Sequence, residues 1–235
     1  MITNFKIALF AYNFPHQKTI DFISILSNSN FKISLILAAN FVPIDSPKSH
    51  FNLFKKEIDV LPKDLAKKYK IPYYVVPHNS EQTKKLLKEY NIDFGIIGGA
   101  RILKKSIIDI FKFGILNFHP GLLPMIRGLD SILWSIYKDF SIGVTAHLIT
   151  DKIDSGELVV QKKINISYDD DIAKLYEKNY QLQLDLIPIS LNLISENKSF
   201  KTLKNDGNYN SKMSYETQLE LNTMIGNYIN RHSKR

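Results

Sequence analysis

Apolar residues in the first half of the chain form short runs that alternate with amphipathic stretches. The runs predict buried strands over residues 6–12, 31–39, 73–76, 93–97 and 114–118. Helical spacing between them predicts helices over residues 17–27, 62–69, 80–90 (with Ser80 as N-cap) and 102–111. Such alternation is typical of a parallel sheet covered by helices on both faces. The sequence therefore predicts a doubly wound, Rossmann-like α/β fold, in which ligands bind beyond the carboxyl ends of the strands.

The second half of the chain has a different order of elements. Its pattern predicts a helix over residues 128–137, strands over 143–150 and 157–166, and a long helix from about 171 that Pro188 kinks. Because only the short loop 151–156 separates the two strands, we expect an antiparallel pair at one edge of the mainly parallel sheet.

The C-terminal residues are expected to form a small extension. We place the main domain at residues 1–198 and the extension at 199–235, with an Asn-rich loop over 198–212 and a helix over 214–228. The apolar stripe of this helix comprises Leu221, Met224, Ile225, Tyr228 and Ile229. Two partners fit the stripe, the body of the same chain or a second copy in a homodimer, and packing on the body is the simpler expectation.

Composition narrows the classes of function. The net charge is +8, but the Lys-Lys pairs are dispersed along the chain, which favours solvated surfaces over a nucleic-acid-binding face. An anionic small ligand remains compatible with this charge.

The absence of cysteine excludes thiolate zinc sites and a cysteine nucleophile, and the six histidines form no helical pair, so no metal site is predicted. Without a leader or a membrane-length apolar run, we expect a cytoplasmic protein.

Three polar residues stand out as candidate catalysts. Asn117 and His119 lie two residues apart at the end of a predicted buried strand, so both side chains point to the same face. Asp154 lies in the loop between the two edge strands. A carboxylate near an imidazole is expected to raise the pKa of that imidazole, and a protonated His and an Asn amide both stabilise an oxyanion. Taken alone, these residue types indicate acyl transfer without choosing the acyl group.

The segment around these residues resembles the folate-dependent formyltransferase family. The resemblance rests on Asn117-Phe-His119-Pro120-Gly-Leu-Leu-Pro124, Arg127-Gly128, Trp134, Gly143-Val-Thr-Ala-His147 and Ile153-Asp154-Ser-Gly156, and weaker likeness covers about residues 5–195. The family implies a catalytic triad of Asn117, His119 and Asp154, with 10-formyltetrahydrofolate as the formyl donor. His147 is expected to support the site without being a catalyst.

The same resemblance implies two groups of binding residues. The expected folate-binding residues are Gly98, Gly99, Ala100, Arg101, Ile102, Leu122, Leu123 and Pro124. The expected acceptor-binding residues are Tyr209 and Lys212, by this resemblance, together with Tyr12, Phe14 and His16, from their position at the end of the first strand. Chemically, the two glycines permit close approach of a ligand, Tyr209 can stack on a base and Lys212 can meet a phosphate.

Departures from the family pattern bear on the acceptor. The first strand is followed by no Gly-rich phosphate loop, unlike the glycinamide ribonucleotide enzymes, and the stretch after residue 200 is too short for the barrel domain of the methionyl-tRNA enzymes. By resemblance we expect a nucleotide-linked amino-deoxy sugar as acceptor, giving an N-formyl sugar for surface polysaccharide. The alternatives are another small amine, such as glycinamide ribonucleotide, and a non-catalytic folate- or nucleotide-binding protein of the same fold.

Overall fold

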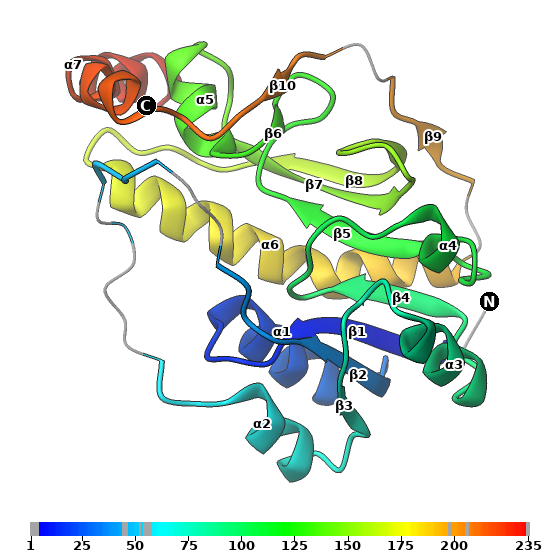
Figure 1. Cartoon of the computed structure of the whole chain (residues 1–235). Coiled ribbons are helices and arrows are strands. Elements are labelled where there is room, and N and C mark those ends of the chain that lie inside the picture. Colours follow the sequence, from blue (N-terminus) through cyan, green and yellow to red (C-terminus); the bar gives the residue numbers. More distant parts are fainter. Residues whose placement is uncertain are drawn as a thin grey trace.

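A computed structural model describes residues 5–43, 47–51, 53, 58–196, 199–204 and 207–233 of the chain (Figure 1). Its main sheet has the strand order β3-β2-β1-β4-β5-β7-β8-β9. The strands are β1 (Ile7–Tyr12), β2 (Ile33–Ala39), β3 (Tyr73–Val75), β4 (Phe94–Ile97), β5 (Ile115–His119), β7 (Gly143–Ile149), β8 (Gly156–Lys163) and β9 (Lys201–Thr202). Pairs from β3 to β5 are parallel, and those from β5 to β9 are antiparallel. The predicted mainly parallel sheet with an antiparallel edge is therefore confirmed.

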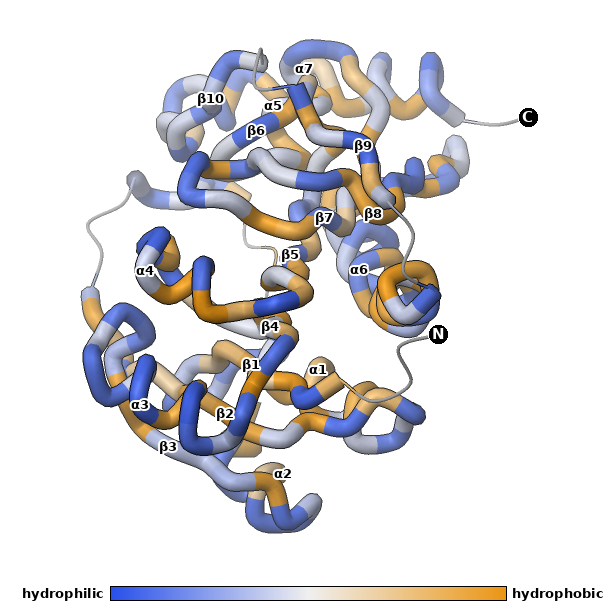
Figure 2. Tube along the Cα trace, turned by 90° about the vertical axis from the view of Figure 1, so that its right-hand side faces the viewer, coloured by the Kyte–Doolittle hydropathy of each residue, from blue (hydrophilic) through white to orange (hydrophobic). Residues whose placement is uncertain are grey.

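Helices cover both faces of this sheet, as Figure 2 shows in side view. The helices are α1 (Gln17–Ser27), α2 (Pro62–Lys68), α3 (Glu81–Glu89), α4 (Lys105–Ile108), α5 (Ser131–Tyr137), α6 (Ile172–Ser195) and α7 (Tyr215–His232). Strand β1 shows why two cores form. Ile7, Leu9 and Ala11 pack with α1, α2 and α6, whereas Ala8 and Phe10 pack with α3 and α4. Alternate side chains of a strand face opposite sides, so a fully apolar strand requires cover on both.

Side-chain hydrogen bonds to the main chain explain where α3 and α4 begin. Ser80 is the N-cap of α3, and its hydroxyl accepts the Thr83 N–H at 3.2 Å, as expected. The helix expected over residues 102–111 is limited to Lys105–Ile108. Asn79 explains the late start, because its side chain donates to Ile102 O and accepts from Lys104 N–H, which holds that stretch extended.

The C-terminal extension is more ordered than the sequence suggested. Two short strands interrupt the expected loop: β9 adds to the sheet edge beside β8, and β10 (Tyr209–Asn210) pairs in parallel with β6 (Arg127–Gly128). Helix α7 packs on α5 as expected, and its residues Leu221, Tyr228 and Ile229 share a core with residues of α5. The extension and the main body thus share one apolar cluster. Among the described residues, no helix has both the length and the apolar character needed to cross a bilayer.

Candidate active site

A cleft of about 700 Å³ lies at the carboxyl ends of the central strands, where the arrowheads of β1 and β5 point in Figure 1. Asn117, His119 and Asp154 all line it. Residues distant in sequence therefore meet at one edge of the sheet, as predicted. The cleft is also bounded by the start of α1 and by Tyr209 of β10.

His119 is held in one orientation by its buried neighbours. Its side chain is only 4% exposed, and Nε2 lies 2.8 Å from Ile126 O and 3.3 Å from Ser131 Oγ. Because a carbonyl oxygen only accepts, Nε2 carries the proton and donates it to Ile126. Gly121 makes room for this bond, since a Cβ at that position would lie 2.9 Å from both bonded atoms. Nδ1 is thereby the unprotonated ring nitrogen.

Asp154 presents its carboxylate to that nitrogen. The residue has φ +48, a left-handed conformation that Asp tolerates better than most residues. Its Oδ2 accepts the Gly128 N–H at 2.6 Å, and its Oδ1 lies 3.4 Å from His119 Nδ1. An unprotonated nitrogen and a carboxylate oxygen thus face each other across a gap suited to one proton.

Asp154 raises the pKa of His119, as expected, but in the free protein that pKa is still lower than its ordinary value. Burial lowers the pKa of His119, and the nearby charges of Lys18 and Arg127 also lower it. The Asp154 carboxylate and the Ile126 carbonyl raise it, but only in part. The sequence showed the carboxylate and not the depth of burial, which dominates here because desolvation disfavours the charged imidazole.

His147 fixes the amide of Asn117. It lies opposite Asn117 in the β5–β7 pair, and its Nε2 is 3.2 Å from Asn117 Nδ2. Its Nδ1 donates to Ser155 O at 3.1 Å, so Nε2 is free to accept from the amide. Burial lowers the pKa of His147 to about 4, with the His119 charge contributing, so this acceptor persists at neutral pH. One N–H of Asn117 is thereby held while the other is available for a ligand.

This arrangement predicts that His147→Phe lowers kcat with little change in KM. The phenyl ring fills the space but cannot accept from Asn117, which leaves the amide free to rotate. We expect a fall of about 10- to 100-fold, the scale of a misplaced catalytic group. His147→Gln retains an acceptor oxygen and should recover part of the rate. Steady-state kinetics with equal losses in both variants would exclude this positioning role.

Most of the expected binding residues line the cleft. Those that do so are Gly98, Gly99, Ala100, Arg101, Ile102, Tyr12, His16 and Tyr209. The space beside Gly99 is taken by the protein itself, because a Cβ there would lie 2.7 Å from the Tyr12 ring. Packing against Tyr12 thus accounts for this glycine without a ligand.

The other expected binding residues lie elsewhere. Phe14 stacks on Tyr12 at 4.8 Å but lines a neighbouring hollow of about 490 Å³. Leu122, Leu123, Pro124 and Lys212 are not among the residues that line the cleft. Leu123 N–H instead donates to the buried Thr145 Oγ1 at 3.0 Å, which ties this loop to the sheet.

Lys18 is a cleft residue that the sequence analysis missed. Its Nζ donates to Phe118 O at 3.2 Å and to Gln183 Oε1 at 3.0 Å, next to both catalytic candidates of β5. Burial lowers the pKa of Lys18 to about 8. The available signal was its position four residues before Phe22, on the buried face of α1.

Fold and site together define a protein with a Rossmann-like sheet and an Asn-His-Asp cluster suited to transfer of an acyl group. The chain belongs to the formyl transferase family, whose model matches residues 29–190.

Two relatives illustrate the sequence likeness, and both are methionyl-tRNA formyltransferases. That of Prochlorococcus marinus (strain MIT 9515) is 32% identical over 151 residues, covering 62% of this chain and 46% of the relative. That of Thermodesulfovibrio yellowstonii is 37% identical over 105 residues, covering 44% and 34%. The chain thus spans less than half the length of these relatives.

Solved structures share the fold at lower identity. Phosphoribosylglycinamide formyltransferase from Anaplasma phagocytophilum has a TM-score of 0.64 at 17% identity, covering 89% of this chain and all of that one. The formyltransferase PseJ from Anoxybacillus kamchatkensis was solved in complex with UDP-4,6-dideoxy-4-formamido-L-AltNAc and tetrahydrofolate. It has a TM-score of 0.61 at 20% identity, covering 95% and 97% of the two chains.

Proposed function

We propose that this protein transfers a formyl group from 10-formyltetrahydrofolate to the amine of a nucleotide-linked amino-deoxy sugar. The convergence of Asn117, His119 and Asp154 on one cleft carries the chemical part of the proposal. Family membership supports formyl transfer, and the cleft volume of about 700 Å³ falls within the range of small-molecule sites.

In this proposal each of the three residues has a role. The acceptor nitrogen attacks the formyl carbon, and the free N–H of Asn117 donates to the oxygen as it becomes negative. The attacking amine gives up a proton, which enters the gap between His119 Nδ1 and Asp154 Oδ1. The C–N10 bond then breaks, and this proton passes to N10 of the departing tetrahydrofolate. Atoms and charge balance without a nucleophile from the protein.

Tyr209 supports the nucleotide-linked acceptor. The residue is 50% exposed and lines the cleft, a placement suited to stacking of its ring on a nucleobase. The nearly full mutual coverage with PseJ, whose crystal holds a UDP-linked sugar, also supports this class of acceptor. A second candidate is methionyl-tRNA, favoured by the named activity of the sequence relatives.

One assay separates these acceptors. The purified protein is incubated with 10-formyltetrahydrofolate and, in parallel, nucleotide-linked amino sugars, glycinamide ribonucleotide and methionyl-tRNA. We expect a formyl mass increment on an amino sugar. Formylation of only the tRNA or only the ribonucleotide would replace the proposed acceptor, and donor binding without turnover on any acceptor would indicate a binding protein.

Tyr209→Ala is expected to weaken acceptor binding about tenfold, the lower range for loss of one base stack. Folate binding and folding should be retained, because the strand bonds of β10 use main-chain atoms. Tyr168→Ala, which removes a tyrosine that is 80% exposed elsewhere, is the matched control. Calorimetric titration with the acceptor tests this, and equal affinities in both variants would remove Tyr209 from the acceptor site.

A further inference from the structure

The short parallel pair of β6 and β10 joins the C-terminal extension to the catalytic cleft. In this pair Tyr209 lies opposite Arg127, and Asn210 lies opposite Gly128. Leu129 N–H donates to Asn210 O at 2.9 Å, and Asn210 Nδ2 donates to Arg127 O at 2.8 Å. The main chain on both sides of Gly128 is therefore fixed by residues of the extension.

Gly128 links this pair to the catalytic carboxylate. Its N–H is the donor to Asp154 Oδ2, and the other carboxylate oxygen faces His119. Gly128 has φ +94, and a Cβ there would overlap Asn210 O, so the close approach of β10 requires glycine. Because one peptide segment bonds β10 on one side and Asp154 on the other, movement of β10 must move the carboxylate.

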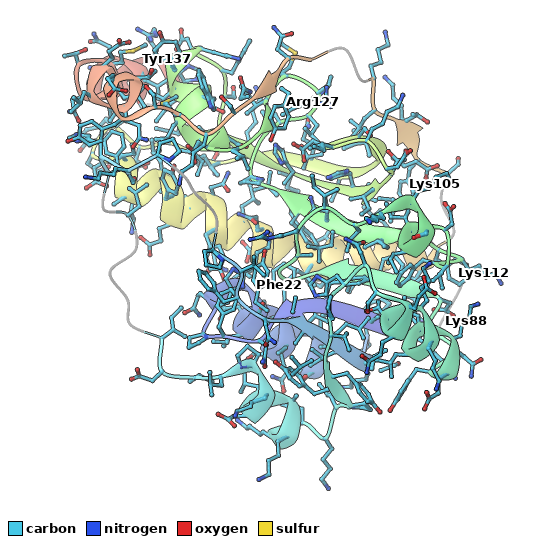
Figure 3. The ribbon with its side chains drawn as sticks, in the orientation of Figure 1. Phe22, Lys88, Lys105, Lys112, Arg127 and Tyr137 are labelled. Atoms are coloured by element: carbon cyan, nitrogen blue, oxygen red, sulfur yellow. The ribbon has the colours of Figure 1, made fainter. Side chains whose placement is uncertain are left out.

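Arg127, which is labelled in Figure 3, provides a second connection between the same two segments. Its Nη1 donates to Gly207 O at 2.9 Å, and its Nη2 donates to Ile153 O at 2.7 Å. Ile153 directly precedes Asp154 in the chain. A planar guanidinium holds two carbonyl groups at a fixed separation, which the single ammonium group of lysine cannot reproduce.

We propose that segment 207–213 is a positioning element of the catalytic centre, which sets the distance between Asp154 and His119 through Gly128 and Arg127. The expected fall in kcat rests on the proposed function, whereas the expected change in the distance between Asp154 and His119 does not. The segment is tied down along its length, since Ser211 O accepts from Trp134 Nε1 at 2.8 Å and Met213 N–H donates to Asp130 Oδ2 at 2.9 Å.

Gly207→Ala tests the proposal without changing any charge. A Cβ at this position would overlap Pro124 O, so the segment must move away from Pro124, which disturbs the bond from Arg127 to Gly207 O. We expect kcat to fall about 10- to 100-fold, with donor KM unchanged, because a displaced catalytic group loses rate rather than donor affinity. Gly226→Ala in α7 is the matched control, since a Cβ there meets nothing within 4 Å.

A second readout needs no activity. The imidazole of His119 is titrated by NMR in the free protein, assigned with His119→Gln. The charged groups facing it are Lys18, Arg127 and Asp154, with His147 as the titratable neighbour on β7. Only the carboxylate raises the pKa of His119 among these groups, so its displacement should lower that pKa. Asp154→Asn sets the limit of the shift, and Gly207→Ala should move toward it.

Arg127→Lys gives an independent variant if Gly207→Ala folds poorly, because it keeps the charge and loses one of the two carbonyl bonds. It should show the same loss of kcat and the same direction of titration shift. Wild-type kcat and an unshifted His119 titration in a folded variant would overturn the positioning role. A wild-type protein without transfer to any acceptor would instead overturn the proposed function, and the titration would then decide the positioning role by itself.

Discussion

His119→Ala is expected to lower kcat about 10³-fold, within the range for loss of a proton-transferring group. The substitution removes the nitrogen that faces Asp154, and with it the proposed acceptor of the amine proton. Donor affinity should change little, because the proposed task of the imidazole is to take the amine proton and not to hold the folate. Single-turnover measurements with saturating donor and acceptor test this prediction.

The control for this variant is His78→Ala. His78 is also a buried histidine, but it lines the neighbouring hollow and bonds Ala11 O and Leu37 O. Truncating either imidazole removes similar buried volume, so thermal unfolding reports the structural cost that both share. A His119→Ala protein with the turnover of the control would show that His119 does not take part in the reaction.

Asp154→Asn is expected to lower kcat about 10²- to 10³-fold while the fold persists. Asn tolerates the left-handed backbone at φ +48, and its amide oxygen can still accept the Gly128 N–H. What disappears is the negative charge that helps to hold a proton on His119. Because that charge raises the pKa of His119, its removal should shift the acid limb of kcat/KM to lower pH.

Asp185→Asn, which neutralises an exposed carboxylate on α6, provides the comparison for Asp154→Asn. It should leave both the rate and the pH profile at wild-type values. If Asp154→Asn changed only KM, the carboxylate would bind substrate and would not assist proton transfer. An acid limb shifted upward would contradict the electrostatic role assigned to Asp154.

The sheet could be predicted from sequence because burial on two faces produces uninterrupted apolar runs. The run that ends at Tyr12 has no polar position before its last residue, and the structure places its side chains in two separate cores. The prediction of a helix over residues 102–111 was wrong at its start and end, because α4 is limited to Lys105–Ile108. Its apolar residues are helically spaced, but the side chain of Asn79, distant in sequence, competes for the main chain of 102–104.

The candidate site was partly predictable for the same physical reasons. Asn117 and His119 are polar residues in an otherwise apolar strand. Unpaired polar side chains there would cost free energy, so the local sequence alone marks these two positions as unusual. Lys18 and the support from β10 are different, because they depend on contacts between segments far apart in the chain. The lowered pKa of His119 also depends on burial, which follows from the packing of Ile126 and Ser131 around the ring.

The pairing of β10 with β6 has a consequence for the order of events during protein synthesis. The residues of the strands from β1 to β8 leave the ribosome before residue 207, and chains generally begin to fold from the N-terminal side as they emerge. A nascent chain can therefore complete its sheet while the Arg127 carbonyl and the guanidinium bridge still lack their C-terminal partners. The segment around Arg127 and Gly128 thus acquires its full set of contacts only after the sheet strands have emerged, so a chain stalled before residue 207 would carry the sheet without these contacts.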